Sequence, residues 1–238
     1  MANLYIEKVN MRVQGYKEKN FMKTISLRRV IGMIIGVIII SLGIAIFKES
    51  HLGNDSISAL NLRIADLRGV SFGVQNMTIN VVFLMIEFIF GRKYIGLGTL
   101  VNGIGVGYIV TFFSGYLTQW FGTLQSLPVQ LLFVVLGVLV TSLGASLYQT
   151  ADLGIAPYDY LSLGLRDYTP FPYFGCRIFT DALCALLTFL LGGLGGIGTL
   201  VCAFCLGPFI SFYNKAVSEK VLRYTPGGLD AADMSSKN

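Results

Sequence analysis

The chain has 238 residues, of which 54% are hydrophobic and 13% are charged, and its mean hydropathy is +0.67. Soluble domains carry about 25% charged residues, so this composition excludes an ordinary soluble globular protein. Most of the net charge of +5 lies near the N-terminus, a placement that favours membrane orientation over nucleic-acid binding. The sequence therefore predicts an all-α polytopic membrane protein that contacts membrane lipid and no nucleic acid.

Residues 1–29 form a basic segment with seven Lys or Arg residues against two Glu residues, and we expect it to be cytoplasmic. The apolar run at 30–47 contains 18 uncharged residues, close to the minimum of about 17–20 that crosses a bilayer. No small-residue cleavage site follows it, so we expect a retained span rather than a signal peptide. The same criteria predict spans at 74–91, 97–116, 127–149, 174–193 and 197–214.

Basic residues near the span ends predict the orientation. With the N-terminus inside, the Arg92-Lys93 turn and the tail at 215–238 also lie on the cytoplasmic side, and both termini are cytoplasmic. The uncharged loop at 117–126 then lies outside. The connection at 48–73 falls on the outer side as well, although it carries Lys48, Arg63 and Arg68.

An internal repeat relates the two halves of the chain at an offset of about 100 residues. Ser41-Leu42-Gly43 recurs as Ser142-Leu143-Gly144, and the GLGTLV stretch at 96–101 recurs as GIGTLV at 196–201. Each half, 30–116 and 127–214, contains three predicted spans. Because an odd number of spans inverts the second copy, the pattern predicts two inverted repeats, a plan common in secondary transporters. The alternative is a duplication that only built a stable bundle.

Two long connections at matching positions are the best candidates for a site. Residues 57–67 and 158–168 have apolar side chains spaced three and four apart, which predicts short helices of about ten residues that do not span the membrane. Asp55 and Ser56 are suitable capping residues, and Pro157 suits a first helical position. Such helix starts bind anionic groups if they point inward. A helix that lies at the interface and seals the bundle is the alternative.

Polar residues recur where the second span of each half begins. Arg177 and Asp181 are four residues apart, so they share one helix face and form either a structural ion pair or a site for an anion and a proton or cation. Asn80 and Asn102 are candidate lining groups. We interpret Glu87 as a satisfied residue at the inner boundary, and Asp159 as a complement to the helix dipole.

The remaining reactive residues predict no catalytic, metal or cofactor site. Cys202 and Cys205 form a lone CxxC with no second pair and no nearby His, which indicates packing rather than metal binding. The one histidine, His51, lies at a span end. Walker and HExxH motifs are absent from the sequence, so we expect neither an enzyme nor an ATP-driven protein.

The stretch ADLGIAPYD at 151–159 and the turn GLGTLVN at 96–102 resemble the YczE/YitT-type family of bacterial integral membrane proteins. That family typically has PWD in the first stretch, where this chain has Tyr158 in place of Trp. The first half has Asn54-Asp55-Ser56 in place of a GxP pattern. The resemblance covers residues 28–215 and implies a compact protein of the bacterial cytoplasmic membrane. The family is largely uncharacterised, so it implies no substrate.

Together these patterns favour a small permease for a small organic solute, with an anionic solute as the first candidate. A membrane accessory protein that binds a protein partner or a lipid-like ligand is the alternative, and a homodimer is compatible with either. The candidate solute-binding residues lie at the two short helix starts and on the second and third spans: Asp55, Ser56, Asn80, Asn102, Pro157, Tyr158, Asp159, Arg177 and Asp181.

Overall fold

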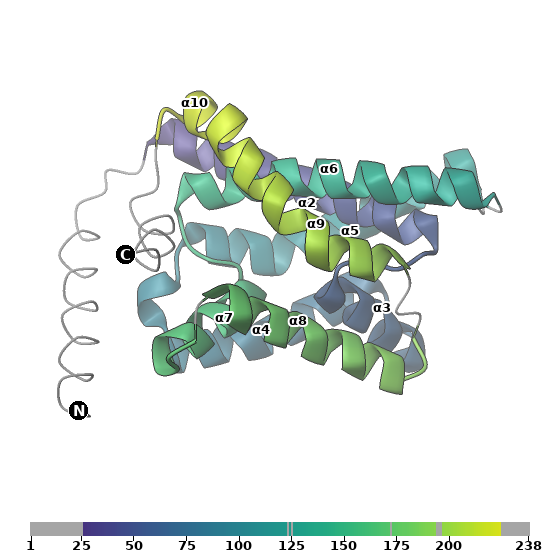
Figure 1. Cartoon of the computed structure of the whole chain (residues 1–238), viewed down its shortest axis with the longest axis horizontal. Coiled ribbons are helices and arrows are strands. Elements are labelled where there is room, and N and C mark those ends of the chain that lie inside the picture. Colours follow the sequence, from purple (N-terminus) through teal and green to yellow (C-terminus); the bar gives the residue numbers. More distant parts are fainter. Residues whose placement is uncertain (1–25, 123, 125, 172, 194–196, 225–238) are drawn as a thin grey trace.

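The computed structural model describes residues 26–122, 124, 126–171, 173–193 and 197–224, and every regular element in these ranges is a helix (Figure 1). The predicted all-α fold is thus confirmed for this part of the chain. The elements in chain order are α2 (Leu27–Ser50), α3 (Ser56–Arg68), α4 (Phe72–Phe90), η1 (Arg92–Tyr94), α5 (Leu97–Phe121), α6 (Leu127–Ala151), α7 (Pro157–Tyr168), α8 (Tyr173–Leu190), α9 (Ile197–Tyr213), η2 (Asn214–Ser218) and α10 (Glu219–Leu222).

Each predicted span coincides with one long helix to within a few residues. Among the described residues, four helices are long and apolar enough to cross a membrane, namely α2, α4, α5 and α6. The other two predicted spans correspond to α8, with 18 residues, and α9, with 17 residues. The two short helices have 13 and 12 residues, as expected for segments too short to span.

One expected boundary is wrong. The first half of the loop predicted at 117–126 is helical, because α5 continues to Phe121 and ends only at Gly122, whose φ is +61°. Nothing in Leu117–Phe121 breaks a helix, and the absence of charge there reflects an apolar helix rather than a loop. The expected tail at 215–238 begins as helix, since η2 and α10 prolong α9. Residues 1–25 and 225–238 lie outside the described residues.

The long helices form two layers (Figure 1). One layer contains α2, α6 and α9, and the other contains α3, α4, α7 and α8. Helix α5 packs on both α2 and α4, so it joins the two layers, whereas α9 packs chiefly on α6 and α8 packs chiefly on α3 and α7.

Glycines let α2 and α6 approach closely as an antiparallel pair. A Cβ added at Gly36 would lie 2.9 Å from the Gly144 carbonyl oxygen, and one at Gly144 would lie 2.5 Å from the Ile40 nitrogen. A Cβ at Gly137 would meet the ring of Phe47 at 2.8 Å. Small residues at such crossings are how helices pack tightly in lipid.

The two long connections have matching backbone conformations. Both preceding helices end at a left-handed residue, His51 (φ +55°) or Asp152 (φ +50°), and a glycine with φ above +110° follows two residues later, Gly53 or Gly154. The Gly98 N–H donates to the Leu153 carbonyl at 2.8 Å, and the Gly198 N–H donates to the Leu52 carbonyl at 2.8 Å. Each GxGT turn is thus bonded to the connection in the opposite half.

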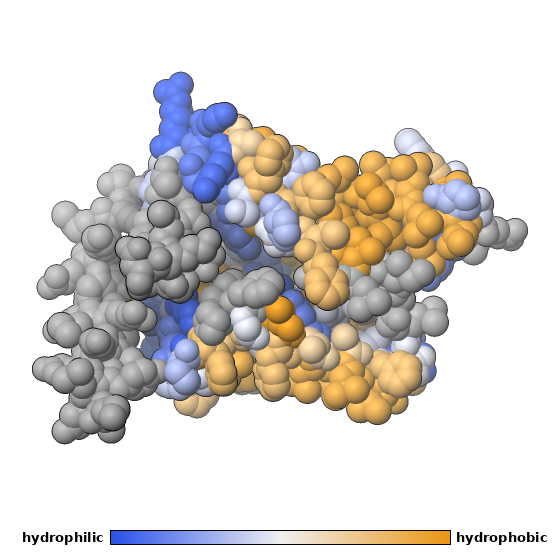
Figure 2. Space-filling model, in the orientation of Figure 1, coloured by the Kyte–Doolittle hydropathy of each residue, from blue (hydrophilic) through white to orange (hydrophobic). Residues whose placement is uncertain are grey.

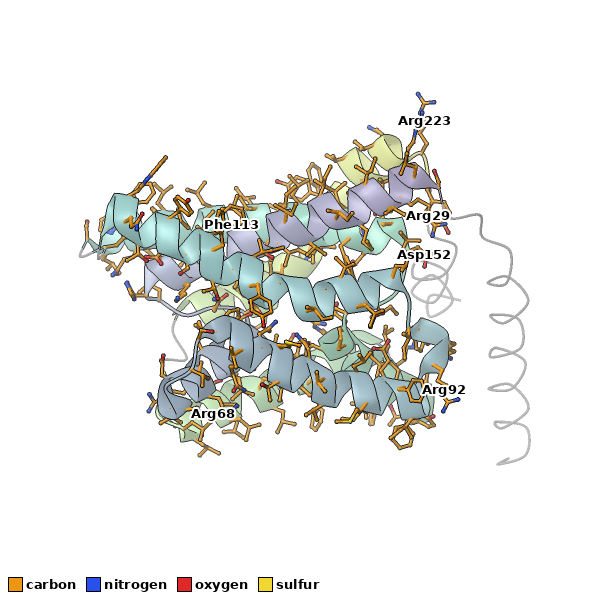
Figure 3. All side chains as sticks on the ribbon, turned by 180° about the vertical axis from the view of Figure 1, so that it is seen from behind. Arg29, Arg68, Arg92, Phe113, Asp152 and Arg223 are labelled. Carbon is orange, nitrogen blue, oxygen red and sulfur yellow. The ribbon has the colours of Figure 1, made fainter. Side chains whose placement is uncertain are left out.

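Charged side chains gather at the ends of the helices (Figure 3). Arg29, Arg92, Arg223 and Asp152 lie at one end, and Arg68 lies at the other. At the first end, Arg29 donates to the carbonyls of Ala151 and Asp152 at 2.7 and 2.6 Å. This bonding places the basic start of α2 beside the end of α6.

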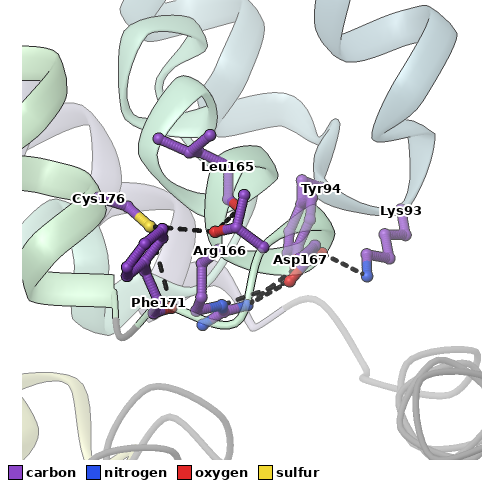
Figure 4. A network of polar contacts seen from close by, with 8 residues as sticks. Lys93, Tyr94, Leu165, Arg166, Asp167, Phe171 and Cys176 are labelled. Atoms are coloured by element: carbon purple, nitrogen blue, oxygen red, sulfur yellow. Dashed lines mark hydrogen bonds and ion pairs between the residues drawn. The ribbon is translucent and has the colours of Figure 1, made fainter. Parts of the chain in front are cut away.

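An ion-pair network at the same end fixes the C-terminal part of α7 to η1 (Figure 4). Asp167 binds Lys93 at 2.9 Å and Arg166 at 2.9 Å, and it accepts the Tyr94 hydroxyl at 2.8 Å. Burial by itself raises the pKa of Asp167, but the hydrogen bonds from Lys93, Arg166 and Tyr94 outweigh it, so the pKa lies below its ordinary value. The network therefore holds the ionised carboxylate.

Replacing Asp167→Asn should lower thermal stability in detergent at pH 7 by about 1 kcal/mol, because three donors lose their charged acceptor. The folded pKa is depressed, so the stabilisation is present above the unfolded pKa of about 4 and is lost as the pH falls through the folded pKa. The difference in melting temperature between wild type and variant should therefore shrink below about pH 4.

Asp66→Asn is the matched control, because Asp66 is exposed on α3. It should change the melting temperature little at either pH. A stability loss for Asp167→Asn that persists unchanged at acidic pH would contradict the electrostatic origin of the effect.

Candidate functional site

The starts of the two short helices meet inside the bundle. Leu60 of α3, Tyr158 of α7 and Cys184 of α8 form one buried apolar cluster, against which Ile57 and Phe83 pack. Ser56 and Pro157, the first residues of α3 and α7, are both buried. The first turns of the two short helices therefore border one apolar cluster, together with residues of α4 and α8.

Asp55 caps α3 as the sequence predicts. One of its carboxylate oxygens accepts the Ser58 N–H at 3.2 Å, and the other, Oδ1, is buried without a hydrogen-bond partner. Burial raises the pKa of Asp55, and the hydrogen bonds from Ser58 only partly offset this. Neighbouring Asn54 is also buried, and it fixes the turn by donating to the Ile44 carbonyl at 3.4 Å and accepting the Asp55 N–H at 3.0 Å.

Arg177 is the centre of the site. Its Nη1 binds Asp159 of α7, and its Nε donates to Asp181 at 3.1 Å along α8. Tyr158 donates its hydroxyl to the other oxygen of Asp181 at 2.7 Å, and the guanidinium lies 5.1 Å from the centroid of the Tyr158 ring. The predicted pairing of Arg177 with Asp181 is confirmed, but Asp159 is a direct partner of Arg177 rather than only a complement to the helix dipole.

Carboxylates outnumber cations in this cluster. Asp55 interacts electrostatically with both Asp181 and Arg177, so three carboxylates surround one guanidinium. The side chains of Arg177, Asp159 and Asp181 remain 31%, 24% and 20% exposed. The cluster is thus partly open, and Asp159 and Asp181 supply two carboxylates to the one guanidinium of Arg177 among the described residues.

Asn80 and Asn102 have different positions. Asn80 donates to the Gly103 carbonyl at 3.1 Å, and Gly103 in turn lies against the ring of Pro157, which a Cβ at Gly103 would approach at 3.3 Å. Asn80 thus joins α4 to α5 beside the start of α7. Asn102 is half-buried, and within the described part of the chain no hydrogen bond joins it to the Arg177 cluster.

Two buried polar features were not recognised as parts of the site from the sequence. Asn61 of α3 donates to Asn76 of α4 at 3.2 Å, with both side chains buried. Glu87 is fully buried and its carboxylate has no hydrogen-bond partner, so the expectation of a satisfied boundary residue is wrong. Its distance in sequence from Arg92 suggested a side chain able to reach the interface. Instead, α7 packs against α4 and covers it.

Hydrophilic surface is visible in the recess between α9 and the layer containing α7 and α8, with apolar surface above and below it (Figure 2). The Arg177 cluster lies on α7 and α8.

Cys202 belongs to a different environment, since it packs with Phe47, Val134 and Val138 in a separate apolar cluster.

Comparisons with known proteins agree with the resemblance seen in the motifs. Residues 27–215 match the model of a family described as a family of unknown function (DUF6198). The uncharacterised protein YyaS of Bacillus subtilis is 30% identical over 190 residues, which is 78% of this chain and 92% of that protein. The uncharacterised membrane protein YczE of the same organism is 24% identical over 202 residues, 84% and 92% of the two chains.

A protein of Haemophilus influenzae, also uncharacterised, is 27% identical over 196 residues, which is 82% of this chain and 85% of that protein. No solved structure matches the chain. The predicted YczE-type family and the membrane character of the chain are thereby confirmed. The names of these relatives supply no activity.

Arg177→Gln should destabilise the protein by about 2 kcal/mol, because it leaves Asp159 and Asp181 together without their cation. The loss should be smaller than for a fully buried pair, since a fifth to a third of each side chain is exposed. Asp181→Asn should cost less, because Arg177 keeps Asp159. Melting temperatures in detergent measure both effects.

The triple variant Arg177→Gln, Asp159→Asn and Asp181→Asn is the control, since it removes the stranded charges and should recover most of the stability. If Arg177→Gln alone were as stable as wild type, the ion pairs would not hold α7 against α8.

Proposed function

The chain belongs to this family of unknown function, and we propose that it is a small multi-pass permease of the bacterial cytoplasmic membrane. Six spans, α2, α4, α5, α6, α8 and α9, form two inverted three-span repeats. The short helices α3 and α7 enter the protein from opposite sides, and their starts form the solute site with Arg177 and Asp181.

The matching bonds between the halves support the inverted repeat. The start of α5 is bonded to the connection before α7, and the start of α9 is bonded to the connection before α3. The helices α5 and α9 begin at opposite ends of the bundle (Figure 1). The two equivalent hydrogen bonds thus lie at opposite ends, as a two-fold axis in the membrane plane requires.

One difference between the halves carries the proposal of transport. Gly107 of α5 and Gly207 of α9 are equivalent in the repeat, yet a Cβ at Gly107 would lie 3.1 Å from Gly73 of α4, whereas one at Gly207 would meet nothing within 4 Å. Helices α4 and α5 are therefore closed on each other, while α8 and α9 are apart. Two related halves in different arrangements are typical of one state of an alternating-access transporter.

The second state follows from exchange of the two arrangements. Helix α9 approaches α8 through Gly207, and α5 separates from α4 at Gly107. The solute cluster on α7 and α8 would then lose its present opening beside α9 and become accessible beside α5.

The charges of the site favour a solute with a protonated amine over the anionic solute expected from the sequence. Arg177 is already bound to Asp159 and Asp181, and Asp55 contributes a buried carboxylate oxygen without a partner. A small ammonium group has three donors and would satisfy these acceptors. Aromatic Tyr158, which already lies beside the guanidinium, adds a ring face that attracts cations.

The positions of the basic residues support cytoplasmic termini. Arg29, Arg92 and Arg223 share one end of the bundle, and Arg68 lies at the other (Figure 3). By the positive-inside rule, this favours the first end as the cytoplasmic one, although Lys48 and Arg63 belong to the connection at the other end.

An accessory protein that binds a lipid-like ligand is the second candidate. An apolar groove between the end of α4 and the start of α5 supports it, and its lining residues are Leu84, Met85, Phe88, Ile89, Ile95 and Leu100. A bilayer lipid tail would fill this groove whether the protein is a permease or an accessory protein.

A ligand screen by thermal shift tests the solute class. Small primary amines should raise the melting temperature of the purified protein with saturation, because ligand that binds only the folded state stabilises it. Carboxylates of the same size are the matched set and should produce no shift. The Asp181→Asn variant should weaken the amine response about tenfold. Saturable shifts with carboxylates alone would restore the anionic solute, and shifts with neither would favour the accessory protein.

Substitution at the two equivalent glycines tests the mechanism. Gly207→Leu should leave thermal stability nearly unchanged, since the position is open, but should reduce solute exchange in proteoliposomes at least about tenfold by blocking closure of α9 on α8. Gly107→Ala should instead lower stability by about 1–3 kcal/mol through the close contact with Gly73. Unimpaired exchange by Gly207→Leu would contradict closure at this position.

A further inference from the structure

Glu87 is the most unusual ionisable residue of the described chain. It lies one turn before the end of α4, its relative exposure is 0%, and both carboxylate oxygens are buried without a hydrogen-bond partner. By contrast, Glu49, the other strongly buried glutamate, accepts hydrogen bonds from Ser114 at 3.1 Å and Thr118 at 2.9 Å. A glutamate can therefore be buried in this fold and still have hydrogen-bond partners, which Glu87 lacks.

The groups that face Glu87 provide no counter-charge. Asp159 and Tyr160 of α7 and Tyr148 of α6 interact with it electrostatically. Helix α5 carries no charged residue. On α3, Arg68 binds Gln75 at the opposite end of α4, and on η1, Arg92 lies over the Phe88 ring and Lys93 binds Asp167.

An ionised carboxylate in this position would be both desolvated and repelled by Asp159. The cost of burying an isolated carboxylate is large enough that the neutral acid forms instead. Glu87 therefore holds a proton in this arrangement of α4 and α7.

We propose that Glu87 is the proton-binding group of the permease and that the protein exchanges its cationic solute for a proton. The inference rests on the proposed function. Asp159 links the two sites, because it interacts with Glu87 and pairs with Arg177. Burial and the negative charge of Asp159 together keep Glu87 protonated. A solute cation beside Asp159 offsets that negative charge, so the carboxylic acid releases one proton and becomes a carboxylate. Departure of the solute restores proton binding.

Glu87→Gln tests this directly, because the amide imitates the protonated acid and cannot release a proton. In proteoliposomes with a lumen more acidic than the bath, wild type should accumulate a radiolabelled amine in the lumen, because protons that leave the lumen drive the amine inward. Glu87→Gln should lose at least about 90% of this accumulation but retain exchange of labelled for unlabelled amine. Glu49→Gln is the matched control and should keep both activities. Gradient-driven accumulation by Glu87→Gln at the wild-type level would overturn the proposal.

Thermal stability in detergent supplies a second readout that needs no transport. A group that is protonated in the folded state and ionised in the unfolded state makes stability fall as the pH rises. Wild type should therefore lose stability relative to Glu87→Gln as the pH rises above about 4.3, the ordinary pKa of a glutamate, and relative to Glu87→Met if the amide variant does not fold.

The two measurements separate the failures. If wild type neither accumulates nor exchanges any amine, the permease proposal fails, while the pH dependence still decides whether Glu87 binds a proton. If the thermal stability of wild type depends on pH in the same way as that of the Glu87 variant, the assignment of the proton to Glu87 is overturned, whatever the transport result.

Discussion

The bridge from Arg177 to Asp159 and Asp181 is the interaction on which the proposed site depends. It joins the first turn of α7 to the face of α8, and Tyr158 completes it through a hydrogen bond to Asp181. Ionisable groups within a membrane protein are expensive unless paired, so their partners define where α7 is held. The buried start of α7 then shares one apolar cluster with α3, and Asp159 also interacts electrostatically with Glu87 on α4. In the proposed mechanism, solute binding and proton binding therefore meet at Asp159.

Glycine placement determines where the helices can and cannot move. The α2 and α6 pair is locked by backbone contact at Gly36 and Gly144, which makes it a natural fixed element between the halves. The contact of Gly107 with α4 has no counterpart at Gly207. The same sequence motif therefore occurs in one close and one separated helix pair. In the proposed mechanism these two pairs exchange their arrangements while α2 and α6 stay packed together.

Sequence periodicity predicted much of this structure because its signals are local. Uncharged runs predicted the positions of the long helices, Asp55 and Pro157 predicted the starts of the short ones, and a spacing of four predicted the Arg177 and Asp181 pair. Contacts between different helices could not be predicted from such local patterns. The pairing of Asp159 with Arg177 and the burial of Glu87 both depend on where α7 docks, and neither is visible from spacing along one helix.

The distances within the two equivalent helix pairs test the central claim most directly. Spin labels at exposed positions of α8 and α9, such as Leu186 and Phe204, and a second set on α4 and α5, would report both distances in protein with the four cysteines replaced. The alternating-access account predicts that an amine solute or a change of pH shifts the two distances in opposite directions, with α8 and α9 approaching as α4 and α5 separate. Two distances that stay fixed under all of these conditions would contradict it.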